Sequence, residues 1–190
     1  MNLKGTRTET NLLAAFAGES QARNRYTYAA ERAREEGYEQ IGWLFEETAG
    51  QEREHARRLF SFLEGGEVQI QAGYPAGIVA GTLENLNAAA AGERYENTTM
   101  YPNFAQVADE EGFKEVAGLF RRIGIAEKRH EDRYVALAKN LTDGIVFERP
   151  TTVRWVCRNC GMVHEATTAP KVCPTCQKPQ AFFELEAVNY

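Results

Sequence analysis

The sequence predicts a mainly α protein: a four-helix bundle with one long crossover connection, followed by a small β-rich metal-knuckle domain. Residues rich in Ala, Glu, Arg and Leu recur with helical spacing from Thr8 to about Leu141. A motif with glutamate three residues before histidine occurs twice in that part, and all four cysteines lie in two CxxC pairs near the end. With 190 residues and 43% hydrophobic composition, the chain can form one sizeable core plus a small second domain.

Four long helices are expected, at residues 6–36, 38–64, 80–110 and 112–141. Gly37, the Gly65-Gly66 pair and Gly112 are the predicted breaks, because glycine is common at helix ends. The turns at Gly37 and Gly112 are so short that each adjoining pair of helices must fold back as an antiparallel hairpin.

The connection between the hairpins, residues 65–78, lacks a helical pattern. Fourteen extended residues reach roughly 46 Å, and a 27-residue helix is about 40 Å long, so this segment can just cross the bundle. Within the third helix, Tyr101-Pro102 conflicts with the pattern, since proline is expected to kink or interrupt the rod.

After Thr142 the composition changes to β-branched and aromatic residues with turn formers. We expect a bundle domain over residues 1–145, a linker near 143–152 and a second domain over 152–190. A domain of about 38 residues is near the limit at which a hydrophobic core alone suffices, so a metal is expected to stabilise it.

The repeated motif is the candidate two-metal site. Its copies share four residue types at identical offsets: Phe45, Glu52, His55 and Arg58, then Phe120, Glu127, His130 and Arg133. An Ala-Gly-Glu triplet precedes each copy, with Glu19 33 residues before Glu52 and Glu93 34 before Glu127. Residues at i and i+3 of a helix lie about 4.5 Å apart along its axis and about 60° apart around it, so each Glu-His pair points one way.

Seven side chains are candidate ligands: Glu19, Glu52, His55, Glu93, Glu96, Glu127 and His130. Six of them fill the di-iron carboxylate pattern of one glutamate from each of two helices and Glu-x-x-His from each of the others, which leaves Glu96 surplus. Buried carboxylates without cations would repel one another and lose hydration. Iron or manganese suits the ligands, and zinc could bind them without redox chemistry.

Many glutamates of the chain have a simpler interpretation. There are 27 acidic residues, and we expect most helical glutamates to be solvated or in i, i+4 pairs, including Glu35, Glu36, Glu46, Glu54 and Glu131. The shared register of the two motifs favours the metal site for the seven candidates. Phe45 and Phe120 are expected to pack in the core, and Arg58 and Arg133 to contact either the ligands or the surface.

The tail predicts a four-thiolate metal site formed by Cys157, Cys160, Cys173 and Cys176. Two such knuckles hold zinc or a single iron tetrahedrally, and the spacing does not choose between them. Trp155, Phe182 and Phe183 are expected around this metal or simply in the domain core. His164 is not expected to be a ligand, because four cysteines complete the shell.

Charge and composition exclude other classes. The net charge of −5 leaves no dense basic patch for nucleic acid. The first residues lack the apolar stretch of a signal peptide, and no window approaches the ~20 apolar residues of a membrane span. Paired cysteines in this arrangement suit a metal site in a reducing compartment, so we expect a cytoplasmic protein.

The stretches AGESQARNRY, QEREHARRLF, FLEGG, AAGERYE, MYPNFA and CRNCGMVHE, with the double Glu-x-x-His motif and the CxxC tail, resemble the rubrerythrin family over nearly the whole chain. The resemblance implies a ferritin-like di-iron domain followed by a rubredoxin-like domain. It also implies a homodimer in which the mononuclear iron of one subunit approaches the di-iron site of the other.

The resemblance implies roles for the ligands. Glu52 and Glu127 would bridge the irons, Glu19 with Glu96 would serve one iron, and Glu93 with His130 would serve the other. In the family, the histidine matching His55 replaces the carboxylate matching Glu96 when the site is reduced. Tyr26 and Tyr101 match tyrosines that hydrogen-bond site carboxylates, although the sequence alone favours ordinary packing for both.

Two positions depart from the rubredoxin pattern. Met162 stands where an aromatic residue usually follows the first knuckle, and Gln177 stands where glycine usually follows the second. Both leave the four thiolates intact, but they affect shielding and hydrogen bonding of the sulfurs, which tune the reduction potential.

The expected function is reduction of hydrogen peroxide to water in oxidative-stress protection. Electrons would come from an external donor, a rubredoxin or a flavoprotein reductase, through the four-cysteine iron to the di-iron site. One alternative is a ferroxidase or iron-handling protein, which would not need an attached electron-entry domain. Another is a metal-binding protein whose tail is a structural zinc ribbon.

Overall fold

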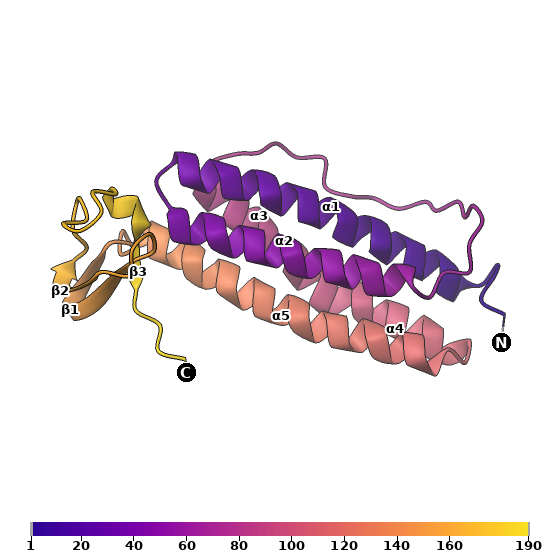
Figure 1. Ribbon diagram of the computed structural model, residues 1–190. Coiled ribbons are helices and arrows are strands. Elements are labelled where there is room, and N and C mark those ends of the chain that lie inside the picture. Colours follow the sequence, from indigo (N-terminus) through magenta and orange to yellow (C-terminus); the bar gives the residue numbers. More distant parts are fainter. Residues whose placement is uncertain (1, 190) are drawn as a thin grey trace.

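The computed structural model describes residues 2–189 as a long helical bundle with a small sheet domain at one end (Figure 1). Its elements, in chain order, are α1 (Arg7–Glu35), α2 (Glu39–Phe60), α3 (Thr82–Tyr95), the π-helix η1 (Glu96–Met100), α4 (Tyr101–Glu110), α5 (Lys114–Thr142), β1 (Glu148–Cys157), β2 (Val163–Thr168), the 3-10 helix η2 (Gln180–Phe182) and β3 (Phe183–Leu185).

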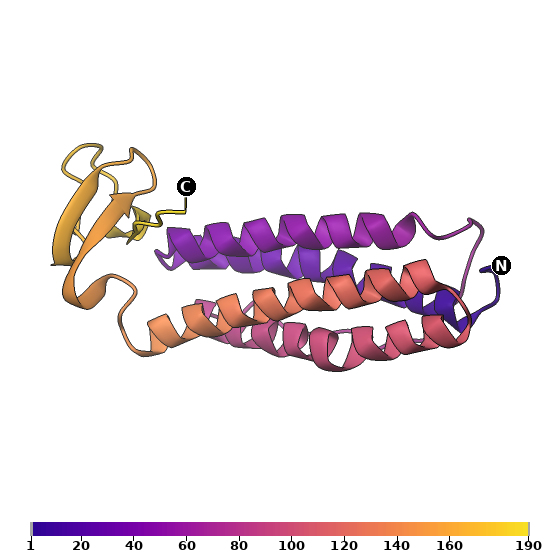
Figure 2. The ribbon, with the colours of Figure 1, turned by 90° about the horizontal axis from the view of Figure 1, so that it is seen from below.

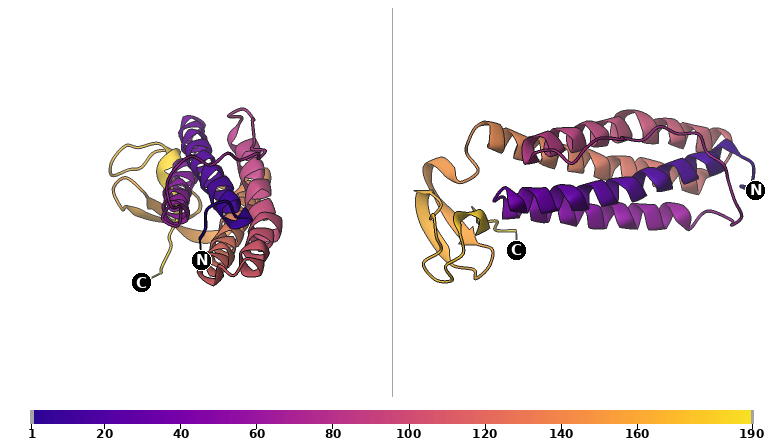
Figure 3. Two further views of the ribbon diagram at one scale, coloured as in Figure 1. Left: turned by 90° about the vertical axis from the view of Figure 1, so that its right-hand side faces the viewer. Right: turned by 90° about the horizontal axis from the view of Figure 1, so that it is seen from above.

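The two predicted helical hairpins are present. Gly37 and Gly112 both have φ of 86°, a left-handed conformation that glycine adopts without steric cost. In each turn the next residue closes the helix end, with Tyr38 N–H donating to Ala33 O and Phe113 N–H to Ala108 O, both at 2.8 Å. The α1–α2 hairpin therefore packs against the hairpin of α3, α4 and α5 (Figure 3).

The crossover between the hairpins runs extended along the outside of the bundle (Figures 1 and 3). It is attached to α1 by the Tyr74 hydroxyl, which donates to Ala14 O at 2.8 Å, and by Gln21, whose amide donates to Pro75 O at 3.1 Å. The second helix was predicted to continue to residue 64, but α2 ends at Phe60 and a turn follows before the Gly65-Gly66 pair.

Pro102 lies in the third rod, the continuous helical segment made of α3, η1 and α4, and it accompanies a π turn rather than a break. Pro102 lies in the first turn of α4 and has no N–H to donate. Immediately before it, the Tyr101 N–H donates to Glu96 O, five residues back, and residues Glu96–Met100 form η1. A wider turn thus absorbs the missing hydrogen bond, and α3, η1 and α4 continue along the bundle (Figure 2).

The bundle core consists of two apolar clusters, one at each end. One contains Tyr26, Phe45 and Tyr134, and the other contains Tyr101 and Phe120. Both Phe45 and Phe120 are fully buried, which confirms their expected packing role. The polar candidate ligands lie along the helices between these clusters, so apolar side chains close the site at both ends.

The tail is a three-stranded antiparallel sheet with strand order β2-β1-β3. Its core includes Trp155 and Phe183, both essentially inaccessible, with Phe182 partly buried beside them. Because β1 begins at Glu148, the connection to α5 is shorter than the expected linker. The domain contacts the start of α2. Arg158 Cζ lies 4.9 Å from the centroid of the Trp43 ring, and the ring centroids of Phe147 and Tyr38, which precedes α2, are stacked 6.1 Å apart.

Within residues 2–189, no helix combines the length and apolarity needed to cross a bilayer.

Candidate metal centres

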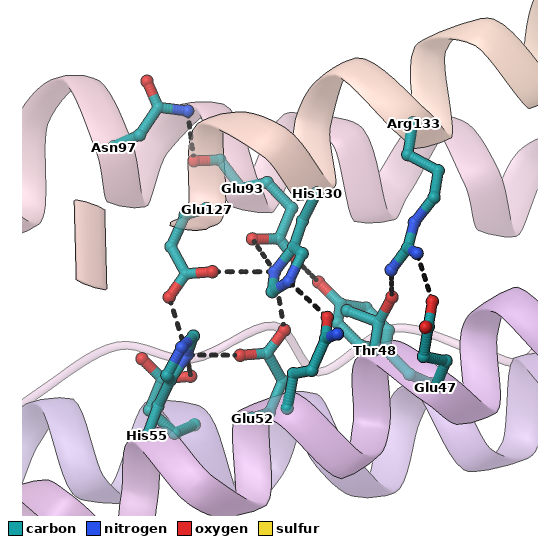
Figure 4. Close-up of polar contacts among 12 residues, drawn as sticks. Glu47, Thr48, Glu52, His55, Glu93, Asn97, Glu127, His130 and Arg133 are labelled. Carbon is teal, nitrogen blue, oxygen red and sulfur yellow. Dashed lines mark hydrogen bonds and ion pairs between the residues drawn. The ribbon is translucent and has the colours of Figure 1, made fainter. Parts of the chain in front are cut away.

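The middle of the bundle brings six of the seven candidate ligands together (Figure 4). They form two groups of four donors that share Glu52 and Glu127, and the donor atoms within each group lie within 4.8 Å of one another. The first group adds Glu19 and His55, and the second adds Glu93 and His130. Four helices contribute, so this centre exists only in the folded bundle.

The two shared carboxylates each face both histidines. His55 Nδ1 lies 3.0 Å from Glu52 Oε2 and 3.0 Å from Glu127 Oε1. His130 Nδ1 lies 3.1 Å from Glu52 Oε1 and 2.8 Å from Glu127 Oε2. Each carboxylate thus directs one oxygen to each group, which is the geometry of a ligand that bridges two ions.

The remaining carboxylates belong to one group each. Glu19 Oε2 lies 3.9 Å from His55 Nδ1, and Glu93 Oε2 lies 3.7 Å from His130 Nδ1. Both oxygens are buried and lack a hydrogen-bond partner. Unpartnered buried acceptors that converge on two points are costly unless cations occupy those points. The residues therefore fit a pair of metal ions.

The electrostatics of the centre also favour positive charge. Burial and the charges of Glu127 and Glu52 raise the pKa of Glu19 well above its usual range. Burial and the charge of Glu52 raise the pKa of Glu93 to about 8, although His130 opposes the shift. Burial would raise the pKa of Glu52 as well, but its contacts with both histidines outweigh that effect and hold it at about 2. Carboxylates repel one another here, and cationic groups relieve the repulsion.

Two buried tyrosines orient the terminal carboxylates. The Tyr26 hydroxyl donates to Glu93 Oε1 at 2.5 Å, and the Tyr101 hydroxyl donates to Glu19 Oε1. Burial raises the pKa of both phenols well above the usual value, so they remain donors. These are the hydrogen bonds that the family resemblance implies, and both rings also pack in the core clusters, as the sequence alone favoured. The hydrogen bonds leave the Oε2 atoms of both glutamates free for metal.

Glu96 is the one candidate outside both donor groups. It is the first residue of η1 and is only partly buried. Burial and the charge of the nearby Glu19 raise its pKa well above the usual range. In this structure His55, rather than Glu96, completes the first donor group.

Sequence reasoning missed several side chains around the centre. Gln51 Oε1 lies 2.8 Å from His130 Nε2, so it can accept the proton of that nitrogen and leave Nδ1 for a metal. Gln51 directly precedes Glu52, but nothing in its spacing signalled this role.

Glu131 was expected in solvent or in an i, i+4 pair, and this was wrong: it is 4% exposed and binds Arg94 and Asn97 of the third rod.

The two motif arginines differ in environment. Arg133 is largely buried and donates to Glu47 and to the Thr48 hydroxyl of α2 (Figure 4). Arg58 is half exposed and pairs with Glu115 at 3.0 Å. Arg133 therefore joins α5 to α2 one turn from the centre, and Arg58 joins the same helices at the surface.

The four predicted cysteines also converge. The Sγ atoms of Cys157 and Cys176 are 3.6 Å apart, and those of Cys160 and Cys173 are 3.7 Å apart. All four are free thiols, and each can offer a sulfur within 4.8 Å of the others. The backbone N–H of Lys178 lowers the pKa of Cys176 to about 6, whereas burial raises the pKa of Cys157, and burial with the neighbouring thiols raises the pKa of Cys160 to about 12. Thiols this close oppose one another's ionisation unless a cation lies between them. His164 lies outside this group of donors.

The departures at Gln177 and Met162 have visible consequences. Gly161 follows the first knuckle with φ of 74°, and Gln177 occupies the corresponding position of the second with φ of 61°. A non-glycine residue is strained there, and its side-chain amide offsets part of the strain by donating to Cys173 O at 3.4 Å. Met162 packs partly buried against the tail core, so a flexible thioether replaces the expected ring.

Comparisons with known proteins agree with both centres. A family profile described as rubrerythrin matches residues 10–138, and one described as the rubrerythrin rubredoxin-like domain matches residues 155–184. A rubrerythrin of Porphyromonas gingivalis is 58% identical over 189 residues, which cover 100% of this chain and 94% of the relative. A rubrerythrin of Nitratidesulfovibrio vulgaris is 56% identical and is covered to 99%.

Solved structures support the architecture. Nigerythrin in a partially reduced state aligns with a TM-score of 0.64 and 33% identity, over 97% of this chain and 88% of that one. The bacterioferritin of Desulfovibrio desulfuricans aligns with a TM-score of 0.64 over 73% of this chain and 82% of its own. At 22% identity the bacterioferritin likeness shows the fold alone. The bundle is ferritin-like, with a small four-cysteine sheet domain after it.

Proposed function

The chain belongs to the rubrerythrin family, and from that premise we propose that it is a non-haem di-iron peroxidase that reduces hydrogen peroxide to water in oxidative-stress protection. The observation that carries the proposal is the presence, in one chain, of a two-metal carboxylate and histidine centre and a separate four-thiolate centre. Peroxide reduction needs two electrons and two protons for each O–O bond broken, and yields two water molecules. A ferroxidase or iron-storage role would not need an attached electron-entry centre.

Each part of the bundle centre has a task in this proposal. Two iron ions would supply both electrons at one place and stabilise the negative charge that develops on oxygen. Glu52 and Glu127 would hold the ions at a fixed separation through their paired oxygens. Tyr26 and Tyr101 keep Glu93 and Glu19 oriented through hydroxyl protons donated to their Oε1 atoms. The apolar clusters at both ends limit the access of bulk water.

His55 and Glu96 supply the adjustable part of the ligand set. Their positions suit an exchange in which His55 serves the first ion in one oxidation state and Glu96 serves it in the other, as the family resemblance implies. The π turn favours this, since Glu96 begins η1 beside Glu19 without belonging to either donor group. The seven side chains would thus act as ligands in two alternative sets.

The four-cysteine iron would receive electrons one at a time from an external rubredoxin or flavoprotein reductase. Its domain contacts the start of α2 at Tyr38 and Trp43, whereas Glu52 lies 14 residues beyond Tyr38, roughly 20 Å along the helix. A head-to-tail homodimer would shorten this path by bringing the partner's four-cysteine centre to the middle of the bundle. A reducing compartment such as the cytoplasm would keep the four thiols free.

The test uses the visible absorbance of a ferric tetrathiolate. Iron-loaded full-length protein is reduced without oxygen and mixed with one equivalent of hydrogen peroxide or of dioxygen. We expect the ferric colour to return much faster with peroxide. In the variant Glu127→Ala, which lacks a ligand shared by both groups, the colour should persist but lose its rapid return.

Other results would redirect the proposal. Faster oxidation of the bundle iron by dioxygen than by peroxide would favour a ferroxidase. If protein made with iron available never becomes coloured, the tail holds zinc and cannot pass electrons.

A further inference from the structure

Asn97 bridges the π turn and helix α5 through a single amide nitrogen. Its Nδ2 donates to the main-chain carbonyl of Glu93 at 2.7 Å (Figure 4). The same nitrogen donates to Glu131 Oε2 at 3.0 Å. An amide nitrogen carries two hydrogens, so both bonds can form together. One bond ends at the main-chain carbonyl of Glu93, itself a candidate ligand, and the other ends at Glu131, which directly follows the candidate ligand His130.

Glu131 is held firmly enough to act as an anchor. Its side chain is 5% exposed, and its other oxygen accepts from Arg94 Nε at 2.7 Å. Lys128 lies 3.8 Å from the oxygen that Asn97 uses. A buried carboxylate is costly unless it is paired, and here all its main partners come from the third rod or from its own helix. Removing Asn97 would therefore leave the carboxylate short of a partner and remove the hydrogen bond that joins the π turn to α5.

The two donor groups depend on this contact unequally. Glu93 and His130 both belong to the second group and lie on the two elements that Asn97 joins. In the first group, Glu19 and His55 come from α1 and α2, whereas the two hydrogen bonds of Asn97 end on α3 and α5. A shift of α3 relative to α5 at this contact would change the Glu93–His130 spacing directly, whereas all four donors of the first group lie on α1, α2 and α5.

We propose that Asn97, held by Glu131, is a positioning residue that sets the spacing between Glu93 and His130 and thereby tunes metal affinity at the second donor group selectively. The inference rests on the two-metal centre of the proposed function, but not on the identity of the oxidant. A side chain that only stabilised the helix would affect both groups alike or neither.

The probe is Mn²⁺, which prefers carboxylate and imidazole ligands over thiolates. Full-length protein is crystallised with limiting Mn²⁺, and anomalous scattering gives the occupancy of each ion position. In Asn97→Leu we expect about tenfold weaker binding at the Glu93–His130 position and less than twofold change at the Glu19–His55 position. Asn97→Gln, which keeps both amide hydrogens, should restore part of the loss.

The matched control is Asn24→Leu. Asn24 Nδ2 also donates to a carbonyl four residues back, Ser20 O at 3.1 Å, but it lies exposed on the straight helix α1. Its replacement should change neither occupancy. If Asn97→Leu does not fold, Arg94→Leu loosens the same anchor from the surface, and a smaller loss confined to the same position is expected.

Equal occupancies in Asn97→Leu and the unaltered protein, or equal losses at both positions, would overturn the inference. That outcome is independent of the proposed function, which fails instead if the unaltered iron protein does not reduce peroxide. Amide hydrogen exchange adds a second readout: residues 96–101 should exchange faster in Asn97→Leu, and α1 should not.

Discussion

Replacing Glu111 with glutamine should destabilise the bundle through the first turn of α1, 103 residues away in sequence. Glu111 Oε2 accepts from the Thr8 N–H at 2.9 Å and from the Thr8 hydroxyl at 2.6 Å. Its Oε1 accepts from the N–H and the Nε of Arg7, both at 3.2 Å. The first N–H groups of a helix have no partners within it, so this carboxylate caps α1 and meets the positive end of its dipole.

The contacts set the size of the effect. Hydrogen bonds from Thr8 hold the pKa of Glu111 at about 2, against an ordinary 4.5. At about 1.36 kcal/mol per pKa unit, this lowering corresponds to roughly 3 kcal/mol. The side chain is 21% exposed, and solvent screens its charge, so we expect Glu111→Gln to lower the free energy of unfolding by about 1.5–2 kcal/mol at pH 7.

The pH dependence has a definite sign. Because folding lowers the pKa of Glu111, its stabilisation is fully present above about pH 4.5 and is lost as the pH falls towards about 2. The difference in unfolding free energy between the unaltered protein and Glu111→Gln should therefore narrow as the pH falls from 5 to 3. Urea unfolding followed by helical circular dichroism measures it.

Glu110 provides the matched control, because it carries the same charge one residue earlier. It is 48% exposed and pairs at 3.0 Å with the guanidinium of Arg7, which is itself 61% exposed. Glu110→Gln should change the unfolding free energy by less than about 0.5 kcal/mol. Equal losses in the two variants at pH 7, or a difference that widens on acidification, would refute the capping argument.

Three further predictions concern packing, strain and ligand orientation. An alanine Cβ at Gly42 would lie 2.9 Å from a carbonyl oxygen of α1, whereas at Gly50 nothing lies within 4 Å. Thermal unfolding should show that Gly42→Ala lowers the free energy of unfolding by about 1–3 kcal/mol and that Gly50→Ala raises it by about 0.5–1 kcal/mol. Equal changes in the two variants would exclude a close contact between α1 and α2 at Gly42. Gln177→Gly should relieve the left-handed strain and stabilise the tail by about 1 kcal/mol, seen as slower loss of tetrathiolate absorbance on heating. Gln51→Leu should weaken Mn²⁺ binding at the donor group of His130 about tenfold in a titration. An unchanged affinity would show that Gln51 does not orient the His130 ring.

The sequence by itself determined the features that depend on local spacing. A glutamate and a histidine three residues apart share one helix face wherever that helix lies, so both motif pairs were placed correctly before any packing was known. Gly37 and Gly112 marked the hairpin turns because few other residues adopt their positive φ without cost. The four cysteines likewise converge as their spacing predicted.

Only the tertiary structure decided which side chains meet across helices. Tyr101-Pro102 predicted a kink or interruption of the third helix. The structure has a π turn there instead, in a rod that packs against neighbouring helices. The ligand pattern left Glu96 surplus while the family resemblance paired it with Glu19, and the packing brings His55 rather than Glu96 into the first donor group. In sequence Glu131 resembles any surface glutamate, but in the structure it is buried and accepts a hydrogen bond from Asn97 of the third rod. Spacing along one helix is fixed by its geometry, whereas contacts between helices depend on rotation and offset, to which each residue in the core contributes.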